Sequence, residues 1–126
     1  MEKPPALEPA LVQEFVVAGH ADLDRTQVLL EEVPGLINAA WDWGGGDWET
    51  ALGGASHMGR KDIAEYLLSK GARLDLFAAA LLGLARVIRA AIDANPDVVN
   101  ALGPHGIPLM THAELGGNKE VIQLLS

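Results

Sequence analysis

The sequence predicts an all-α domain built from about four stacked helix–turn–helix units. Aromatic residues make up only 5% of the 126 residues, whereas alanine, leucine and glycine are abundant. This composition suits closely packed short helices better than a sandwich of β-sheets. The chain also contains similar stretches in which a segment of small residues, a glycine and an apolar segment follow one another. Finally, side chains that can cap helices stand near the points where these segments begin.

Each of three similar stretches predicts two helices joined by a turn at a glycine. The stretches are residues 51–68, 76–92 and 109–125, and their aligned glycines are Gly59, Gly83 and Gly117. Within the first stretch, Ile63 and Leu67 lie four positions apart and share one helix face, and the other stretches have matching pairs. We expect this face to pack against the neighbouring unit. The spacing from Gly59 to Gly83 is shorter than the next one by about one hairpin, which predicts a truncated finger there.

The expected helix starts and ends agree with this division. Asp62, Asp75 and Asn118 each precede an apolar segment, and their side chains can accept hydrogen bonds from the free amides of a first helical turn. Gly71 follows a predicted helix and can adopt the left-handed conformation that ends one. These residues predict where three of the helices begin and where one of them stops.

A less regular unit is expected at the N-terminal end of the chain. LEEVPGLINA at 30–39 resembles IDANPDVVNA at 92–101, with proline, asparagine and alanine at matching positions. Residues 15–39 carry extra positions after Gly19, as the terminal cap of a repeat array can. The pattern at 119–126 stops within a predicted helix, which leaves open that the chain is a piece of a longer array.

These units resemble the ankyrin-repeat family, in which helix pairs alternate with projecting hairpins. The matching positions are Thr50, Leu52, Ala55, Gly59, Ile63, Leu67, Leu68, Gly71 and Ala72 in one unit, and Gly106, Met110, Ala113, Gly117, Glu120, Val121, Leu124 and Leu125 in the last. The resemblance implies one short, degenerate, bacterial-type ankyrin solenoid over residues 1–126, with units at 7–40, 47–75, 76–100 and 103–126. The family's Thr-Pro-Leu-His turn is altered in both matching units, so we expect those turns to be less firmly held.

The glycine-rich stretch GGGDWETALGG at 44–54 is interpreted as a hairpin turn. A phosphate-binding loop of the Walker type requires Gly-Lys followed by Ser or Thr, and this stretch contains no lysine. A dinucleotide-binding fold requires a buried strand before the glycines, and AAWDW at 39–43 is too short and too polar to supply one. Glycines at this place most simply provide the positive φ angles of a turn.

Three tryptophans, Trp41, Trp43 and Trp48, flank this predicted turn. Tryptophans on a protruding finger are typical anchors of protein interfaces. Alternatively, they fold back and cover the exposed face of the irregular N-terminal unit. Both interpretations stay open at this point.

The ankyrin resemblance implies that a partner binds the concave side, which is formed by the fingers and the ends of the first helices. The predicted partner-binding residues are Trp43, Asp47, Trp48, Glu49, His57, Met58, Leu81, Leu82 and Leu115. Such a groove has an apolar floor and an acidic lip, which suits a helix or loop with apolar anchors beside Lys or Arg. For Leu81 and Leu82, burial beneath adjoining units is the alternative.

Charge and composition exclude several classes of partner. Nine basic residues against 17 acidic ones give a net charge of −8, which disfavours nucleic acid and anionic lipid surfaces. No cysteine is present, so disulfides and cysteine-bound zinc are excluded. The first 15 residues lack the pattern of a secretion signal, and no run of about 18 apolar residues occurs. We therefore expect a cytoplasmic protein without a membrane segment.

The sequence predicts no catalytic residue, no metal site and no cofactor. Its four histidines are widely spaced, and none has a neighbour at the spacing that places two ligands on one helix face: His20, His57, His105 and His112. We expect them to be hydrogen-bonded or solvated, with a zinc site as the minor alternative. Ser56 lacks the strand and the Gly-x-Ser-x-Gly turn of a hydrolase nucleophile.

The predicted function is that of a protein–protein interaction module, not an enzyme. One alternative is a structural or self-associating segment of a larger assembly, in which Leu81 and Leu82 meet a second copy of the chain. Another is a small-molecule or hydrolytic site near His57, His105 and His112. We expect a monomer, with a homodimer as the alternative.

Overall fold

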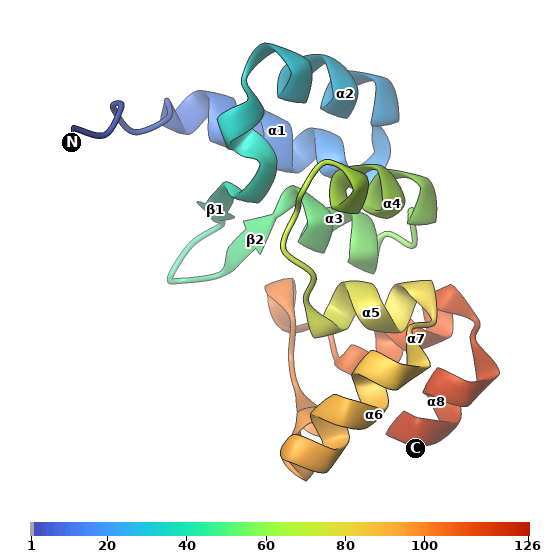
Figure 1. Ribbon diagram of the computed structural model, residues 1–126. Coiled ribbons are helices and arrows are strands. Elements are labelled where there is room, and N and C mark those ends of the chain that lie inside the picture. The colour runs from blue at the N-terminus through green and yellow to red at the C-terminus, as the bar shows by residue number, and fades with distance from the viewer. Residues whose placement is uncertain (1) are drawn as a thin grey trace.

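The computed structural model describes residues 2–126, and within them the chain is mostly helical with one small two-stranded sheet (Figure 1). This confirms the predicted helical class in its general form. The α-helices are α1 (Pro9–Ala21), α2 (Leu23–Glu32), α3 (Ala51–His57), α4 (Lys61–Ser69), α5 (Leu76–Leu82), α6 (Ala85–Ala94), α7 (Leu109–Gly116) and α8 (Lys119–Leu125). The strands are β1 (Ala40–Asp42) and β2 (Trp48–Thr50), and short 3-10 helices span Pro34–Asn38, Pro96–Asn100 and Pro104–Gly106.

Three helix pairs follow the predicted units, with the predicted glycines at their turns. Gly59 joins α3 to α4, Gly83 joins α5 to α6, and Gly117 joins α7 to α8. Their φ angles are 71°, 74° and 74°, in the left-handed region that side chains disfavour. Gly71, which follows α4, also has a positive φ of 99°. The predicted order of helix, glycine turn and helix is therefore confirmed.

Two of the three predicted helix caps are present. The Asp75 carboxylate accepts a hydrogen bond from the backbone N–H of Ala78 at 2.8 Å, and Asn118 caps the start of α8 in the same way. The prediction for Asp62 was wrong, because α4 begins at Lys61 and Asp62 lies inside its first turn. There the Asp62 carboxylate pairs with the Arg60 guanidinium at 2.8 Å.

Consecutive pairs pack against one another along the chain. The first helices contact in the order α1, α3, α5, α7, and the second helices α2 and α4, and α6 and α8, also meet (Figure 1). Two glycines permit the closest approaches: a Cβ on Gly19 would lie 2.8 Å from the Cα of Ala51, and one on Gly116 would overlap the carbonyl oxygen of Leu81. The core therefore forms between successive helix pairs.

The glycine-rich stretch forms the predicted hairpin turn. β1 and β2 pair antiparallel, with Trp41 opposite Glu49, and the φ angles of the three glycines at 44–46 are all positive. The Asp42 carboxylate stabilises the turn, since it accepts hydrogen bonds from the backbone N–H groups of Gly44 and Gly46. The turn interpretation is thus confirmed.

A second projecting segment lies next to this hairpin. Residues 101–109 fold back on themselves through a bridge between Leu102 and Pro108, with His105 at the tip. Residues 70–75, which join α4 to α5, contain no strand, as expected for a truncated finger. With no strand there, the tip residue His105 reaches the hairpin and donates its backbone N–H to the Asp47 carboxylate at 2.8 Å.

Within residues 2–126, none of the helices has the length and apolar character that crossing a lipid bilayer requires.

Candidate metal centre

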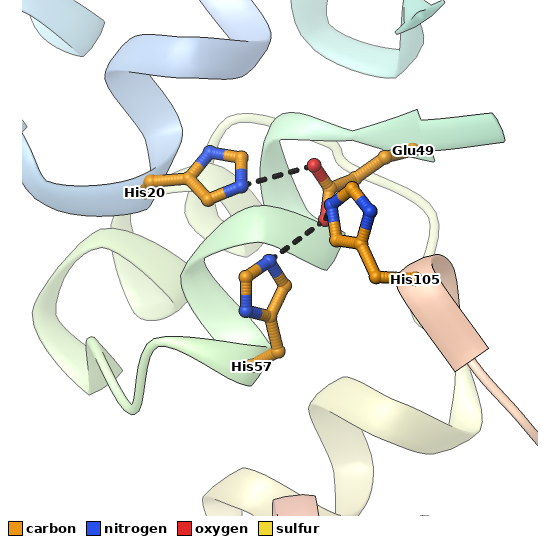
Figure 2. Close-up of side chains that lie close together, drawn as sticks. All are labelled: His20, Glu49, His57 and His105. Carbon is orange, nitrogen blue, oxygen red and sulfur yellow. Dashed lines mark ion pairs between the residues drawn. The ribbon is translucent and has the colours of Figure 1, made fainter. Parts of the chain in front are cut away.

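Three of the four histidines converge on one buried glutamate (Figure 2). His20 comes from the end of α1, Glu49 from β2, His57 from the last residue of α3, and His105 from the tip of residues 101–109. One nitrogen or oxygen atom of each side chain lies within 4.8 Å of the corresponding atoms of the other three. Sequence spacing did not predict this cluster, because the four residues come from four separate elements.

The Glu49 carboxylate stands at the centre of the cluster. Its Oε1 atom lies 3.0 Å from the Nε2 atom of His20, and its Oε2 atom lies 2.9 Å from Nε2 of His57. The Nε2 atom of His105 lies 3.4 Å from the same Oε2. The Glu49 side chain is 0% exposed, so the three imidazoles shield a carboxylate that water does not reach.

Outer contacts fix the orientation of two of the imidazoles. The Nδ1 atom of His20 lies 2.8 Å from the carbonyl oxygen of Val16, and Nδ1 of His105 lies 2.8 Å from the Asp47 carboxylate. Both partners can only accept a hydrogen bond, so each Nδ1 carries a proton. In the neutral ring the lone pair is then on Nε2, which faces the centre of the cluster. Carbonyl and carboxylate partners of this kind orient histidines that bind metals.

Two buried atoms of the cluster have no hydrogen-bond partner. Trp43 donates its indole N–H to Oε1 of Glu49 at 2.9 Å, but Oε2 of Glu49 and Nε2 of His57 form no hydrogen bond. These two atoms are close together, yet their geometry is not that of a hydrogen bond. Leaving buried polar atoms unpaired is costly, and such atoms often mark the place of a ligand.

The ionisation of the cluster follows from its contacts. Burial raises the pKa of Glu49, but the imidazoles of His20 and His57 together lower it by more than burial raises it. The net pKa therefore lies well below its usual range. Conversely, the Glu49 carboxylate raises the pKa of His20 despite its partial burial. Glu49 is therefore ionised and presents a negative charge to the three rings.

Small residues and an unusual backbone conformation make room for these side chains. A Cβ on Gly54, in α3, would lie 2.6 Å from the ring of His20, so only glycine leaves space for that ring. His105 has a φ of 62° and is the only non-glycine residue of the described chain in the left-handed region. Strained residues of this kind cluster at functional sites, where surrounding contacts hold them.

The residues predicted to bind a partner separate into surface, cluster and core. Exposed side chains belong to Trp43, Trp48, Met58 and Leu115, and partly buried ones to Asp47, His57 and Leu82. Leu81 and Glu49 are buried, with 0% and 1% of their surface exposed, so neither lies on the surface, and for Leu81 the alternative of burial beneath adjoining units holds. Leu81 packs in the core with buried residues that come mainly from α1 to α4, and Glu49 faces the histidines. Of the flanking tryptophans, Trp41 packs against the core, whereas Trp48 is 60% exposed.

The fourth histidine lies outside the cluster, and one of its two ring nitrogens has the expected hydrogen bond, whereas its buried Nε2 has none. His112 is buried against Phe77, and its Nδ1 lies 2.9 Å from the carbonyl oxygen of Pro108. Burial lowers the pKa of His112, so the ring is held neutral. Ser56 donates its hydroxyl to the carbonyl oxygen of Leu52 at 2.7 Å and is fully buried.

No protein-family model matches this sequence, and no curated protein matches it.

Proposed function

We propose that this chain binds one transition-metal ion, zinc in the first place, between His20, Glu49, His57 and His105. The observation that carries the proposal is the convergence of three imidazole nitrogens and a buried carboxylate within 4.8 Å. Imidazole and carboxylate are zinc ligands with bond lengths of about 2.0–2.2 Å, and four of them make a tetrahedral site. Since the atoms already face one another, small side-chain movements would suffice to enclose an ion.

The charges and donor types support a transition metal over magnesium or calcium. Those hard cations prefer six or more oxygen ligands, whereas this cluster offers mainly nitrogen. The ionised carboxylate of Glu49 offsets part of the charge of a divalent ion. Because four protein ligands fill a tetrahedral shell, the site favours a structural or regulatory ion over a catalytic one, which keeps an open position.

Zinc titration of the untagged chain tests this proposal. Calorimetry or competition with a chelating dye should show one zinc ion per chain, while magnesium should not bind at the same site. Changing Glu49→Gln or His57→Ala should weaken zinc binding by more than about 100-fold, the most expected for losing an outer contact. His112→Gln, which removes a histidine outside the cluster, should keep the affinity. Equal affinities in all four proteins would contradict the proposal.

We further propose that the helix pairs form an ankyrin-type solenoid that binds another protein, as the family resemblance implies. The stacked pairs and their glycine turns support the repeat interpretation, and the exposed side chains of Trp48, Met58 and Leu115 support a docking surface. Their exposed fractions are 60%, 50% and 48%. A monomer in the cytoplasm is part of this proposal, and the lack of cysteine is compatible with a reducing compartment.

Two measurements separate this second proposal from self-association. Sedimentation at several concentrations should give a monomer, whereas a concentration-dependent dimer would favour pairing of two copies. A partner captured from lysate should then be lost when Trp48 and Met58 are both changed to Ser. Capture that is unchanged by this double substitution would exclude the exposed residues as the docking surface.

A further inference from the structure

The buried core of the protein divides into two parts, and the histidine cluster bridges them. One cluster of buried residues comes mainly from α1 to α4, with Ala78 and Leu81 of α5 added, and the other comes from α5 to α8. We call these the N-terminal and C-terminal halves. His20, Glu49 and His57 belong to the N-terminal half, whereas His105 lies between α6 and α7 and belongs to the C-terminal half.

His105 therefore holds a position that none of the other three ligands shares. It carries residues 101–109 onto the hairpin, where Asp47 accepts hydrogen bonds from both its backbone N–H and its Nδ1. The His105 and Asp47 side chains are 35% and 32% exposed, so water competes for these bonds. Exposed polar contacts of this kind contribute little to stability on their own.

The backbone of His105 also opposes the observed arrangement. Its φ of 62° is a conformation that residues with a side chain disfavour. An exposed pair of hydrogen bonds that must hold a strained residue is a weak attachment. A bond from a metal ion to Nε2 of His105 would add a strong one, and this nitrogen already faces Glu49 at 3.4 Å.

We propose, building on the zinc site proposed above, that the ion is a clamp between the two halves. Zinc bound to His20, Glu49 and His57 recruits His105 as its fourth ligand and fixes residues 101–109 on the hairpin. Without zinc, this segment is held by the Asp47 contacts and opens more often. Zinc occupancy thereby controls how firmly the C-terminal half is joined to the N-terminal half at the projecting segments.

Hydrogen exchange of the full chain, with and without zinc, tests the clamp. The amides to follow are those of His105, Gly106 and Leu109. The His105 N–H donates a hydrogen bond to Asp47 of the hairpin, and the other two donate hydrogen bonds within residues 101–109. Because opening of the segment removes one of the four ligands, saturating zinc should slow their exchange at least 10-fold, the factor by which His105 strengthens zinc binding. The amides inside α4 serve as the internal control, because they belong to the N-terminal half and should change less.

His105→Asn is the diagnostic variant. Asparagine tolerates the left-handed conformation, so the backbone is preserved. Its side chain is shorter and has no imidazole nitrogen to bind the ion. We expect this variant to bind zinc through the remaining three ligands at least 10-fold more weakly. At saturating zinc, its residues 101–109 should exchange as fast as in the zinc-free protein.

Failure of the clamp and failure of the zinc site give different results. If zinc binds but leaves exchange in residues 101–109 unchanged, or binds His105→Asn as tightly as the unaltered chain, the clamp is wrong and the ion is held by His20, Glu49 and His57 without His105. If zinc does not bind the unaltered chain at all, both proposals are wrong. Should His105→Asn fail to fold, Asp47→Asn provides the second test, because it weakens the contacts that position His105 and should lower zinc affinity 10-fold or more.

Discussion

At the scale of single residues, Glu49 determines the electrostatics of the cluster. A carboxylate that is 1% exposed would be neutral in an apolar site, but the imidazoles around it keep it ionised. The same interaction raises the pKa of His20, and the contact with Glu49 is the largest cause of that increase. The two residues therefore stabilise each other's charged forms in the metal-free protein.

Changing Glu49→Gln should lower the pKa of His20, because its largest stabilising contact is lost. Proton NMR titration of the imidazole Cε1–H signal, recorded without metal, measures this value directly. Glu14→Gln, which removes an exposed carboxylate that pairs with Arg25, is the control and should leave the pKa of His20 unchanged. An unaltered pKa in Glu49→Gln would show that the carboxylate does not contact His20 in solution.

His112 should make stability depend on pH in a defined direction. Burial lowers the pKa of His112 below the ordinary value of 6.5, so the unfolded chain binds a proton more readily than the folded one. The stability that the protein has with a neutral His112 is therefore complete above that ordinary pKa and is lost as the pH falls below it. Urea unfolding between pH 7.5 and about pH 5 should show a smaller loss of stability for His112→Gln than for the unaltered chain. Equal losses would indicate that His112 is not held neutral.

The surroundings of the individual histidines could be predicted only in part. His112 has the hydrogen bond and burial that an isolated histidine in a helix commonly has, and the sequence interpretation was adequate for it. His20 and His57 stand at the ends of α1 and α3, which are adjacent in space but far apart in the chain. Local spacing detects two ligands on one helix, and it has no means of detecting ligands from separate elements.

At the scale of elements, helix starts depend on single side chains. Asp75 accepts a hydrogen bond at the start of α5, whereas Asp62 lies within α4 and pairs with the exposed Arg60. Asp75→Ala should therefore lower the free energy of unfolding by about 1 kcal/mol, and Asp62→Ala should change it by less than about 0.5 kcal/mol. Urea denaturation measures both. Equal effects would mean that the cap contributes nothing beyond an exposed charge.

The packing of α5 on α7 depends on a glycine. A Cβ on Gly116 would overlap the carbonyl oxygen of Leu81, which belongs to backbone and cannot turn aside. Gly116→Ala should therefore destabilise the protein by about 1–3 kcal/mol, as overpacking typically does. Gly35→Ala is the matched control, because its nearest atom would be a leucine methyl group at 3.8 Å. Thermal unfolding of both variants should show a lower midpoint for Gly116→Ala alone.

Most elements could be predicted because local chemistry specifies them. The turn glycines, the hairpin at 44–46 and the caps Asp75 and Asn118 each satisfy a backbone requirement that few other residues meet. Asp62 misled the prediction, because the residue before an apolar segment need not be the residue before the helix. Here α4 begins already at Lys61, and no side chain caps it.

At the scale of the whole molecule, the order of helix pairs creates the site. Since residues 70–75 contain no strand, the hairpin and residues 101–109 come into contact, although the chain between them spans α3 to α6. The truncated finger was predicted from the glycine spacing, but its consequence was not. That consequence depends on how far the neighbouring segments project, which side-chain patterns do not specify.

X-ray absorption at the zinc edge tests the central claim most directly. The zinc-loaded, untagged chain should show nitrogen and oxygen ligands at about 2.0–2.2 Å, with the multiple scattering of three imidazoles and one carboxylate. In Glu49→Gln the zinc should be lost or should gain water ligands. A spectrum of hydrated zinc, or of zinc bound by fewer than two imidazoles, would contradict the account.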